Sequence, residues 1–388
     1  MRPEFSRAWR AAAVAAGLIA SVTVPSSALA DSIRDRQWHV SALRLTEAHK
    51  ISRGEGIIVA VVDSGVDAAH PDLAGSVLPG TDLGSAGDGR SDTAGHGTAM
   101  ASAIAARGHG PGGGDGVIGV APGARILPIR DQGSSGGSRG TGDGIRWAAD
   151  HGAKIINISA GGADLSAVRS AVEYAIGKGI IVVAAAGNDG GPVEAPAMYP
   201  GVVAVAGTGR DGSLWPKSGR GREVVAAAPA AEIAGAEPGG RYSITAGTSD
   251  AAAITSGVLA LVWAKFPSLD AANVINRLIK TADDKGEPGR DPSFGYGLVN
   301  PVRALTADVA SAATHPLLPS AASPAPSAPA SAREPGGPAS SSDAARGGGN
   351  EQSPALMAAA IAAGALMVLA GGALAIFMRK RRKVHTGR

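Results

Sequence analysis

Short runs of β-branched and aliphatic residues alternate with apolar helical stretches through the middle of the chain. Such runs, without alternating polar positions, are typical of strands that are buried on both faces of a sheet. Strands are predicted at residues 57–62, 126–129, 154–158, 180–185, 202–206 and 224–227. Helices are predicted at residues 99–106, 144–150, 165–176, 249–266 and 273–281. The repeated strand-then-helix order predicts an α/β fold, with a mostly parallel sheet and helices on both of its faces.

The first 30 residues have the pattern of an export signal. Arg2, Arg7 and Arg10 form a basic start, and residues 11–24 are apolar but too short to span a bilayer. Ala28-Leu29-Ala30 is a small-x-small cleavage site. We therefore expect residues 1–30 to be a signal peptide and the mature chain to begin at Asp31.

The last part of the chain has the pattern of a membrane anchor. Residues 355–378 carry no charge and are long enough to cross ~30 Å of hydrocarbon as a helix. A basic run, residues 379–383, follows directly, and positive charge stays on the cytoplasmic side. We expect a transmembrane helix at 354–378 and a cytoplasmic tail at 379–388. The rest would then lie outside the cell membrane as a single-pass protein.

Between these ends, composition divides the chain into three parts. Residues 31–53 form an N-terminal extension, too short to fold alone and expected to pack along the following domain. Residues 54–306 form the predicted catalytic domain. Residues 307–353 are rich in Pro, Ser and Ala with almost no large apolar groups, which predicts a disordered linker.

Composition narrows the chemistry further. The chain of 388 residues contains no cysteine, which excludes disulfides and thiolate metal sites. Its net charge is only +3, and we expect no nucleic-acid partner. The acidic loop 88–92 lacks the spacing of a calcium site and is interpreted as solvated turns. We predict neither a metal nor a cofactor.

Three polar residues occupy positions that suit catalysis. Asp63 ends the first buried strand, where α/β sheets meet their ligands. His96 lies between two glycines, and Ser249 opens the apolar helix, close to unpaired N–H groups and the positive end of the helix dipole. A serine there is by itself most simply an N-cap. Together with an imidazole base and an orienting carboxylate, it forms an acid–base–nucleophile triad.

Other candidate motifs do not fit their context. His70 is expected to be solvated, and Asp72 to be an ordinary turn residue. Residues 108–113 formally match the dinucleotide-binding fingerprint, but they follow a helix and no helix opens after them, so residues 107–116 are interpreted as a glycine-rich loop that contains His109. Residues 133–137 match the nucleophile elbow of α/β-hydrolases but are expected to form a surface loop.

The catalytic stretches resemble those of the subtilisin-like serine proteases. They are Val62-Asp63-Ser64-Gly65-Val66, Gly95-His96-Gly97-Thr98 and Gly247-Thr248-Ser249, in that family's order of Asp, His and Ser. The resemblance covers residues 54–305 and implies a three-layer subtilisin-like fold that hydrolyses peptide bonds of polypeptide substrates. It also implies that Asn188 binds the oxyanion and that Ser159-Ala160-Gly161 pairs with the substrate backbone.

Within that family the chain is most similar to the mycosins, the membrane-anchored proteases of type VII secretion systems in actinobacteria. The similar features are the lead-in from Gln37-Trp38 to Glu47-Ala48, the absence of a long prodomain, the Pro-rich linker and the single C-terminal span. This resemblance implies association with type VII secretion components. The lack of cysteine is a departure, since mycosins often carry disulfides.

Two further departures adjoin the serine. The family usually has an apolar residue after it and a proline four positions after it, where this chain has Asp250 and Ala253. We expect the charge of Asp250 to raise the pKa of His96, since a nearby anion favours the imidazolium. The same departures favour an alternative, a catalytically weak scaffold that stabilises a membrane complex. A general degradative surface protease is the second alternative.

Overall fold

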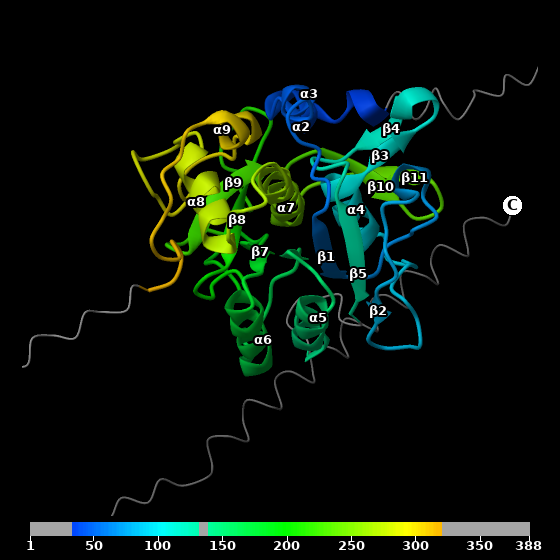
Figure 1. Ribbon diagram of the computed structural model, residues 1–388, viewed down its shortest axis with the longest axis horizontal. Coiled ribbons are helices and arrows are strands. Elements are labelled where there is room, and N and C mark those ends of the chain that lie inside the picture. Colours follow the sequence, from blue (N-terminus) through cyan, green and yellow to red (C-terminus); the bar gives the residue numbers. More distant parts are fainter. Residues whose placement is uncertain (1–32, 132–138, 320–388) are drawn as a thin grey trace, which may run out of the picture. The chain divides into compact units, whose positions relative to one another are not determined.

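The computed structural model of the chain describes residues 33–131 and 139–319. Its central feature is a seven-stranded sheet in the order β2-β5-β1-β6-β7-β8-β9, in which every neighbouring pair is parallel (Figure 1). The strands are β1 (Ile58–Asp63), β2 (Thr81–Asp82), β5 (Arg125–Arg130), β6 (Ile155–Ile158), β7 (Ile181–Ala185), β8 (Val203–Thr208) and β9 (Val224–Pro229). The predicted parallel α/β architecture is confirmed.

Helices cover both faces of this sheet, and each face has its own apolar core. On one face, α5 and α6 pack over side chains such as Val62, Ile156 and Val182. On the other face, α4 and α7 pack over the alternate residues of the same strands, such as Val61, Ile155 and Val183. The helices are α4 (His96–Ala105), α5 (Arg139–Asp150), α6 (Ser166–Gly177), α7 (Thr248–Lys265), α8 (Ala271–Thr281) and α9 (Pro301–Thr306).

Helix α7 lies at the centre of the domain. Every residue from Thr248 to Trp263 is buried, and the helix packs against β6, β7, β8, β9 and α4. A helix that is apolar all round can be stable only when it is enclosed in this way. Because its N-terminal end lies in the protein interior, its first residues are held by neighbouring strands and loops.

Two small antiparallel sheets were not predicted. One pairs β3 (Arg107–His109) with β4 (Asp115–Ile118), and the other pairs β10 (Ile233–Glu237) with β11 (Arg241–Thr245). The interpretation of residues 107–116 as a loop was therefore wrong in part. β3, β4 and β10 are short and contain glycine, and β11 is a single run of five residues, so none gave a clear strand pattern without its partner. Short 3₁₀ turns occur at η1 (Pro71–Leu73) and η2 (Pro111–Gly113).

The N-terminal extension packs along the domain, as expected. It contains the short helices α2 (Trp38–Ala42) and α3 (Leu45–Ala48). Leu45 is fully buried in the core, and the hydroxyl group of Ser52 donates to the carbonyl oxygen of Leu261 in α7 at 2.8 Å. The guanidinium group of Arg34 donates to the carbonyl oxygens of Gly113, Asp115 and Gly116 at 3.1, 3.0 and 2.6 Å. The extension is thus part of the folded domain.

Several predicted segments lie outside the described residues. These are the signal peptide, the loop 133–137, most of the linker and the C-terminal span. In the described part of the chain, no helix combines the length and the apolar character needed to cross a membrane.

Candidate active site

The ends of three adjacent strands form one side of the candidate site. Asp63 is the last residue of β1, Ser159 follows β6, and Asn188 lies three residues after β7. These strands are neighbours in the sheet and run parallel, so their carboxyl ends meet at one edge. Ligands of open α/β sheets bind at this edge, near the strand where the order of connection reverses. Here that strand is β1, with β5 on one side and β6 on the other.

Asp63 and His96 are in direct contact. Nδ1 of His96 lies 2.9 Å from both carboxylate oxygens of Asp63. The Asp63 side chain is only 6% exposed, whereas the His96 side chain is 44% exposed. The buried carboxylate therefore fixes the ring orientation and leaves Nε2 as the nitrogen available for proton transfer.

Asp92 holds the loop that carries His96, a role not predicted from the sequence. Its Oδ1 accepts from the hydroxyl of Ser64 at 3.0 Å and from N–H of Gly95 at 2.9 Å, and its Oδ2 accepts from N–H and hydroxyl of Thr98 at 3.0 and 2.7 Å. Asp92 is buried, so the interpretation as a solvated turn was wrong. Asp92 lies four residues before α4 and is not its N-cap, so the usual capping signal does not point to it.

Ser249 lies at the start of α7, with its side chain directed toward the end of β6. Its hydroxyl donates to the carbonyl oxygen of Ser159 at 2.9 Å, and the Ser159 hydroxyl donates to the Ser249 carbonyl oxygen at 3.0 Å. Asn157 Nδ2 donates to the Ser159 hydroxyl at 2.9 Å, and Asn157 Oδ1 accepts from Ser256 at 3.0 Å. This buried network fixes the helix that carries Ser249 to strand β6.

Asn188 is oriented by the same helix end. Its Oδ1 accepts from the N–H of Thr248 at 2.8 Å and from the Thr248 hydroxyl at 2.9 Å. Because two donors fix the amide oxygen, the amide NH₂ is left as the donor that faces outward. The N–H of Ser249 is also in the first turn of α7, where an N–H has no acceptor within the helix. The two groups are suited to stabilise a negatively charged oxygen.

All residues predicted for the site line a single pocket of about 330 Å³. They are Asp63, His96, Ser159, Ala160, Gly161, Asn188 and Ser249. The pocket is an open hollow, and Asp131 and Thr141 line it as well. The structure therefore brings together every residue that the sequence singled out for catalysis, oxyanion binding and substrate binding.

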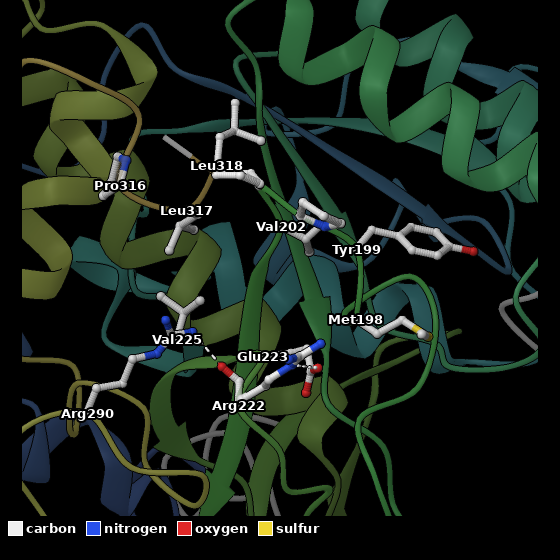
Figure 2. A pocket seen from close by; sticks show the side chains of 13 residues that line it. Met198, Tyr199, Val202, Arg222, Glu223, Val225, Arg290, Pro316, Leu317 and Leu318 are labelled. Atoms are coloured by element: carbon white, nitrogen blue, oxygen red, sulfur yellow. Dashed lines mark hydrogen bonds and ion pairs between the residues drawn. The ribbon is translucent and has the colours of Figure 1, made fainter. Parts of the chain in front are cut away.

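A second pocket of about 330 Å³ lies elsewhere (Figure 2). Its walls include Met198, Val225 and Leu317. Its charged residues already have partners in the protein: Arg290 donates to the carbonyl oxygen of Arg222 at 2.7 Å, and Arg222 pairs with Glu223. No base lies beside a nucleophile there, so this pocket offers no comparable chemistry.

The electrostatics of the site favour a charged His96. Burial opposes the charged ring, but the charge and hydrogen bond of Asp63, followed by the charges of Asp250 and Asp92, raise the pKa of His96 to about 9. Asp250 is itself buried, which raises its pKa to about 7, although a hydrogen bond from the Thr245 hydroxyl at 2.9 Å favours its anion. The expected effect of Asp250 on His96 is therefore present.

Two other histidines differ from expectation. His70 is fully buried: Nδ1 accepts from the N–H of Asp72 at 3.1 Å, and Nε2 lies 3.1 Å from the carbonyl oxygen of Arg241. His109 belongs to β3, and its Nδ1 lies 2.6 Å from Oδ1 of the fully buried Asp72. The interpretations of His70 as solvated and of Asp72 as a simple turn residue were wrong, because β11 and β3 cover this loop.

The described residues also limit the possibilities for a metal. Within 33–131 and 139–319, no group of three or more His, Cys, Asp or Glu side chains is arranged to hold a metal ion.

The match to a family model now identifies the domain. The model of the subtilase family matches residues 54–297, which includes every residue that lines the candidate site. The chain belongs to the subtilase family. It is a subtilisin-like serine peptidase, and the predicted subtilisin-like fold and serine endopeptidase class are confirmed.

Known relatives support this identification. This subtilase is 36% identical to fervidolysin of Fervidobacterium pennivorans, over 69% of this chain but only 43% of that protein. It is 34% identical to mycosin-1 of Mycobacterium tuberculosis, over 74% of this chain and 76% of that protein. The solved structure of the serine protease MycP1 is 38% identical and matches with a TM-score of 0.63, over 71% of this chain and 89% of that one. The predicted likeness to mycosins is thus confirmed.

Proposed function

We propose that this subtilase is a membrane-anchored extracellular endopeptidase that works with a type VII secretion system. In this proposal Ser249 is the nucleophile, His96 the general base and acid, and Asp63 the group that orients His96. Asn188 and the N–H of Ser249 bind the oxyanion. The observation that carries the chemical part is the contact of His96 with Asp63 in the pocket that also contains Ser249 and Asn188.

The reaction is acyl transfer to water. The Ser249 hydroxyl exchanges its hydrogen bond to Ser159 for one to Nε2 of His96, gives up its proton there and attacks the peptide carbonyl carbon. His96 then returns that proton to the departing amine, and water releases the acyl group by the same steps in reverse. Asp63 stabilises the imidazolium that forms in between.

Substrate binding follows from the strand edge beside the serine. The segment Ser159-Ala160-Gly161 continues from β6 and lines the pocket. An extended peptide can pair with such an edge through backbone hydrogen bonds. That pairing supports polypeptides as the substrates.

A specific observation also favours the scaffold alternative. With a pKa of about 9, His96 is mostly protonated at neutral pH and then cannot accept the proton of Ser249. A smaller fraction of neutral His96 would slow proteolysis near neutrality, and proteolysis would increase in alkaline medium. Activity-based labelling at two pH values separates these functions.

The labelling experiment uses the full-length protein and a fluorophosphonate probe. We expect labelling at pH 9 that disappears in Ser249→Ala and is much weaker at pH 6.5. A matched control, Ser213→Ala, changes an exposed serine whose hydroxyl bonds only Asp211, and should label like the wild type. Absence of labelling at both pH values in the correctly folded protein would contradict the proposed chemistry.

The proposed location and partners rest on the sequence and on relatives. The signal peptide, the uncharged run 355–378 and the basic run after it support a single C-terminal span with an extracellular domain. MycP1 is described as an essential component of the type VII (ESX-1) secretion system, which supports a similar partner here. The general degradative alternative would have no such partner.

Two measurements test this part. Truncation before residue 354 should release the protein from membranes into the medium, and unchanged membrane association would contradict the anchor. Deleting the gene should stop type VII export, whereas export that continues normally would favour the degradative alternative. Complementation with Ser249→Ala then tells whether the secretion role needs the chemistry.

A further inference from the structure

Behind the predicted substrate edge lies a carboxylate without a partner. Among the described residues, the side chain of Glu194 forms no hydrogen bond and no ion pair, and it is half-buried. Asp283, which is also half-buried, is paired with Arg303. Because burying an anion without a partner is unfavourable, the unpaired carboxylate of Glu194 calls for an explanation.

The backbone holds Glu194 between the ends of two neighbouring strands. Its N–H donates to the carbonyl oxygen of Ala186, which follows β7, at 3.2 Å. The next residue, Ala195, accepts from the N–H of Gly162, which follows β6, at 3.0 Å. Residues 194–195 thus run across the crevice that opens where β6 and β7 end, and the position of Glu194 is fixed from both sides.

Glycines leave the carboxylate accessible from the active site. A Cβ atom added at Gly161, which lines the catalytic pocket, would lie 2.2 Å from Oε2 of Glu194. A Cβ atom added at Gly187, beside Asn188, would lie 3.2 Å from Oε1. No side chain at either position separates the carboxylate from the crevice, and any larger residue at Gly161 would displace it.

The local charge is negative. Burial raises the pKa of the Glu194 carboxyl, and the charge of Asp189, on the same loop, raises it further. Asp189 is exposed and bonds only the N–H of Gly191, at 2.9 Å. Two carboxylates thus adjoin one crevice, and neither is neutralised by a basic side chain of the described protein.

We propose that Glu194 selects a positively charged side chain, lysine or arginine, at the substrate residue whose carbonyl is attacked. This inference rests on the proposed function. A peptide that pairs with Ser159-Ala160-Gly161, with its carbonyl at Ser249 and Asn188, directs the adjoining side chain over Gly161 into the crevice. A lysine or arginine there meets the Glu194 carboxylate, which gains the partner that it lacks.

The first experiment compares two substrates that differ only in charge. Peptide p-nitroanilides ending in lysine or in norleucine have side chains of similar length, and only lysine carries an ammonium group. With the full-length protein at pH 9, we expect kcat/KM to be at least ~10-fold higher for lysine, because a charge-assisted hydrogen bond contributes about 1.5 kcal/mol or more.

Glu194→Gln should remove this preference. It keeps the shape of the side chain and abolishes its charge, so the lysine-to-norleucine ratio should approach 1 while cleavage of the norleucine substrate stays within about twofold. Asp189→Asn is the matched control on the same loop and should retain most of the preference. An equal loss on both substrates, or no preference in the wild type, would overturn the proposal.

A binding measurement separates this inference from the catalytic proposal. In full-length Ser249→Ala, fluorescence of p-aminobenzamidine, an arginine mimic, should report binding that is at least ~10-fold weaker in Ser249→Ala/Glu194→Gln. Absence of binding, with intact fluorophosphonate labelling of the wild type, overturns only the selectivity for cations. Binding without labelling or cleavage supports the cation site and overturns the proposed chemistry instead.

Discussion

The hydroxyl of Ser249 donates to the backbone carbonyl of Ser159, and the hydroxyl of Ser159 donates to the backbone carbonyl of Ser249, at 2.9 and 3.0 Å. This reciprocal pair joins the start of a buried helix to the end of a buried strand. In the free protein the serine is therefore positioned by the sheet, while His96 is positioned separately by Asp63. Both residues line the same pocket.

Asn157 is the residue whose removal should loosen this junction. Asn157→Ala deprives the buried hydroxyl groups of Ser159 and Ser256 of a partner each. We expect a loss of about 1–3 kcal/mol in the free energy of unfolding, since the Ser256 hydroxyl is left without a partner while the Ser159 hydroxyl keeps its bond to Ser249. Urea denaturation of the full-length protein measures it.

The control for this change is a polar residue at the edge of the core. Asn273→Ala removes a half-buried side chain that bonds Asp270 and the N–H of Ala312, and it should cost less because both groups can then bond water. If the two variants lose similar stability, the network around Asn157 does not hold the helix to the sheet.

Asn188 should matter for rate and not for binding. Asn188→Ala removes the outward NH₂ donor, and we expect kcat to fall about 10²–10³-fold with KM little changed. Asn188→Asp keeps the acceptor for Thr248 and removes only the donor, so it should be at least as impaired. Steady-state kinetics measure kcat and KM of both variants. An unchanged kcat in Asn188→Asp would show that Asn188 only holds the start of α7.

The rate should depend on pH through His96. Because only the neutral ring accepts a proton and the pKa of His96 is about 9, activity should rise with pH toward that value. Asp250→Asn or Asp250→Met removes a charge that favours the imidazolium, so the acidic limb of the kcat/KM profile should move to lower pH. Asp211→Asn, an exposed carboxylate that is not among the charges acting on His96, should leave the limb in place. An unmoved limb in both Asp250 variants would contradict this coupling.

Stability should depend on pH through Asp250. The pKa of Asp250 is about 7 in the folded protein and near 3.8 when the chain is unfolded, so the folded state binds the proton more tightly than the unfolded state does. The protein therefore loses stability as the pH rises from about 3.8 to about 7. The shift corresponds to a loss of about 4 kcal/mol at most in the free energy of unfolding. We expect Asp250→Asn, which retains a partner for Thr245, to be more stable than the wild type at pH 8 and similar to it at pH 4. Thermal unfolding at both pH values measures the difference; equal Tm differences at the two pH values would exclude titration of Asp250 as the cause.

The N-terminal extension should stabilise the β3–β4 hairpin. Arg34→Met removes three hydrogen bonds to carbonyl oxygens of this hairpin, and we expect a loss of about 1–3 kcal/mol together with faster amide exchange at residues 107–118. Arg36→Met, an exposed neighbour, is the matched control. Unchanged exchange in Arg34→Met would mean that the hairpin is stable without the extension.

The sequence by itself determined the parallel sheet and the membership of the site. Uninterrupted β-branched runs can be buried only in a sheet that is covered on both faces, and residues that end such strands or begin an enclosed helix meet at one edge. Asp63 and Ser249 could be recognised for this reason, His96 from the glycines beside it, and Asn188 only from the resemblance to the family. The predicted ends of the central strands and helices were also close to the observed ends, since a change from apolar to polar residues marks them.

Only the tertiary structure decided which polar groups are buried and what they touch. Asp92, His70 and Asp72 occupy turns that look solvated in the sequence, and they are buried because segments distant in the chain cover them. Glu194 has no local pattern at all: its place between the ends of β6 and β7 depends on how two loops cross. Burial sets the cost of a charge, and burial is a property of the packed fold that neighbouring residues in the sequence do not specify.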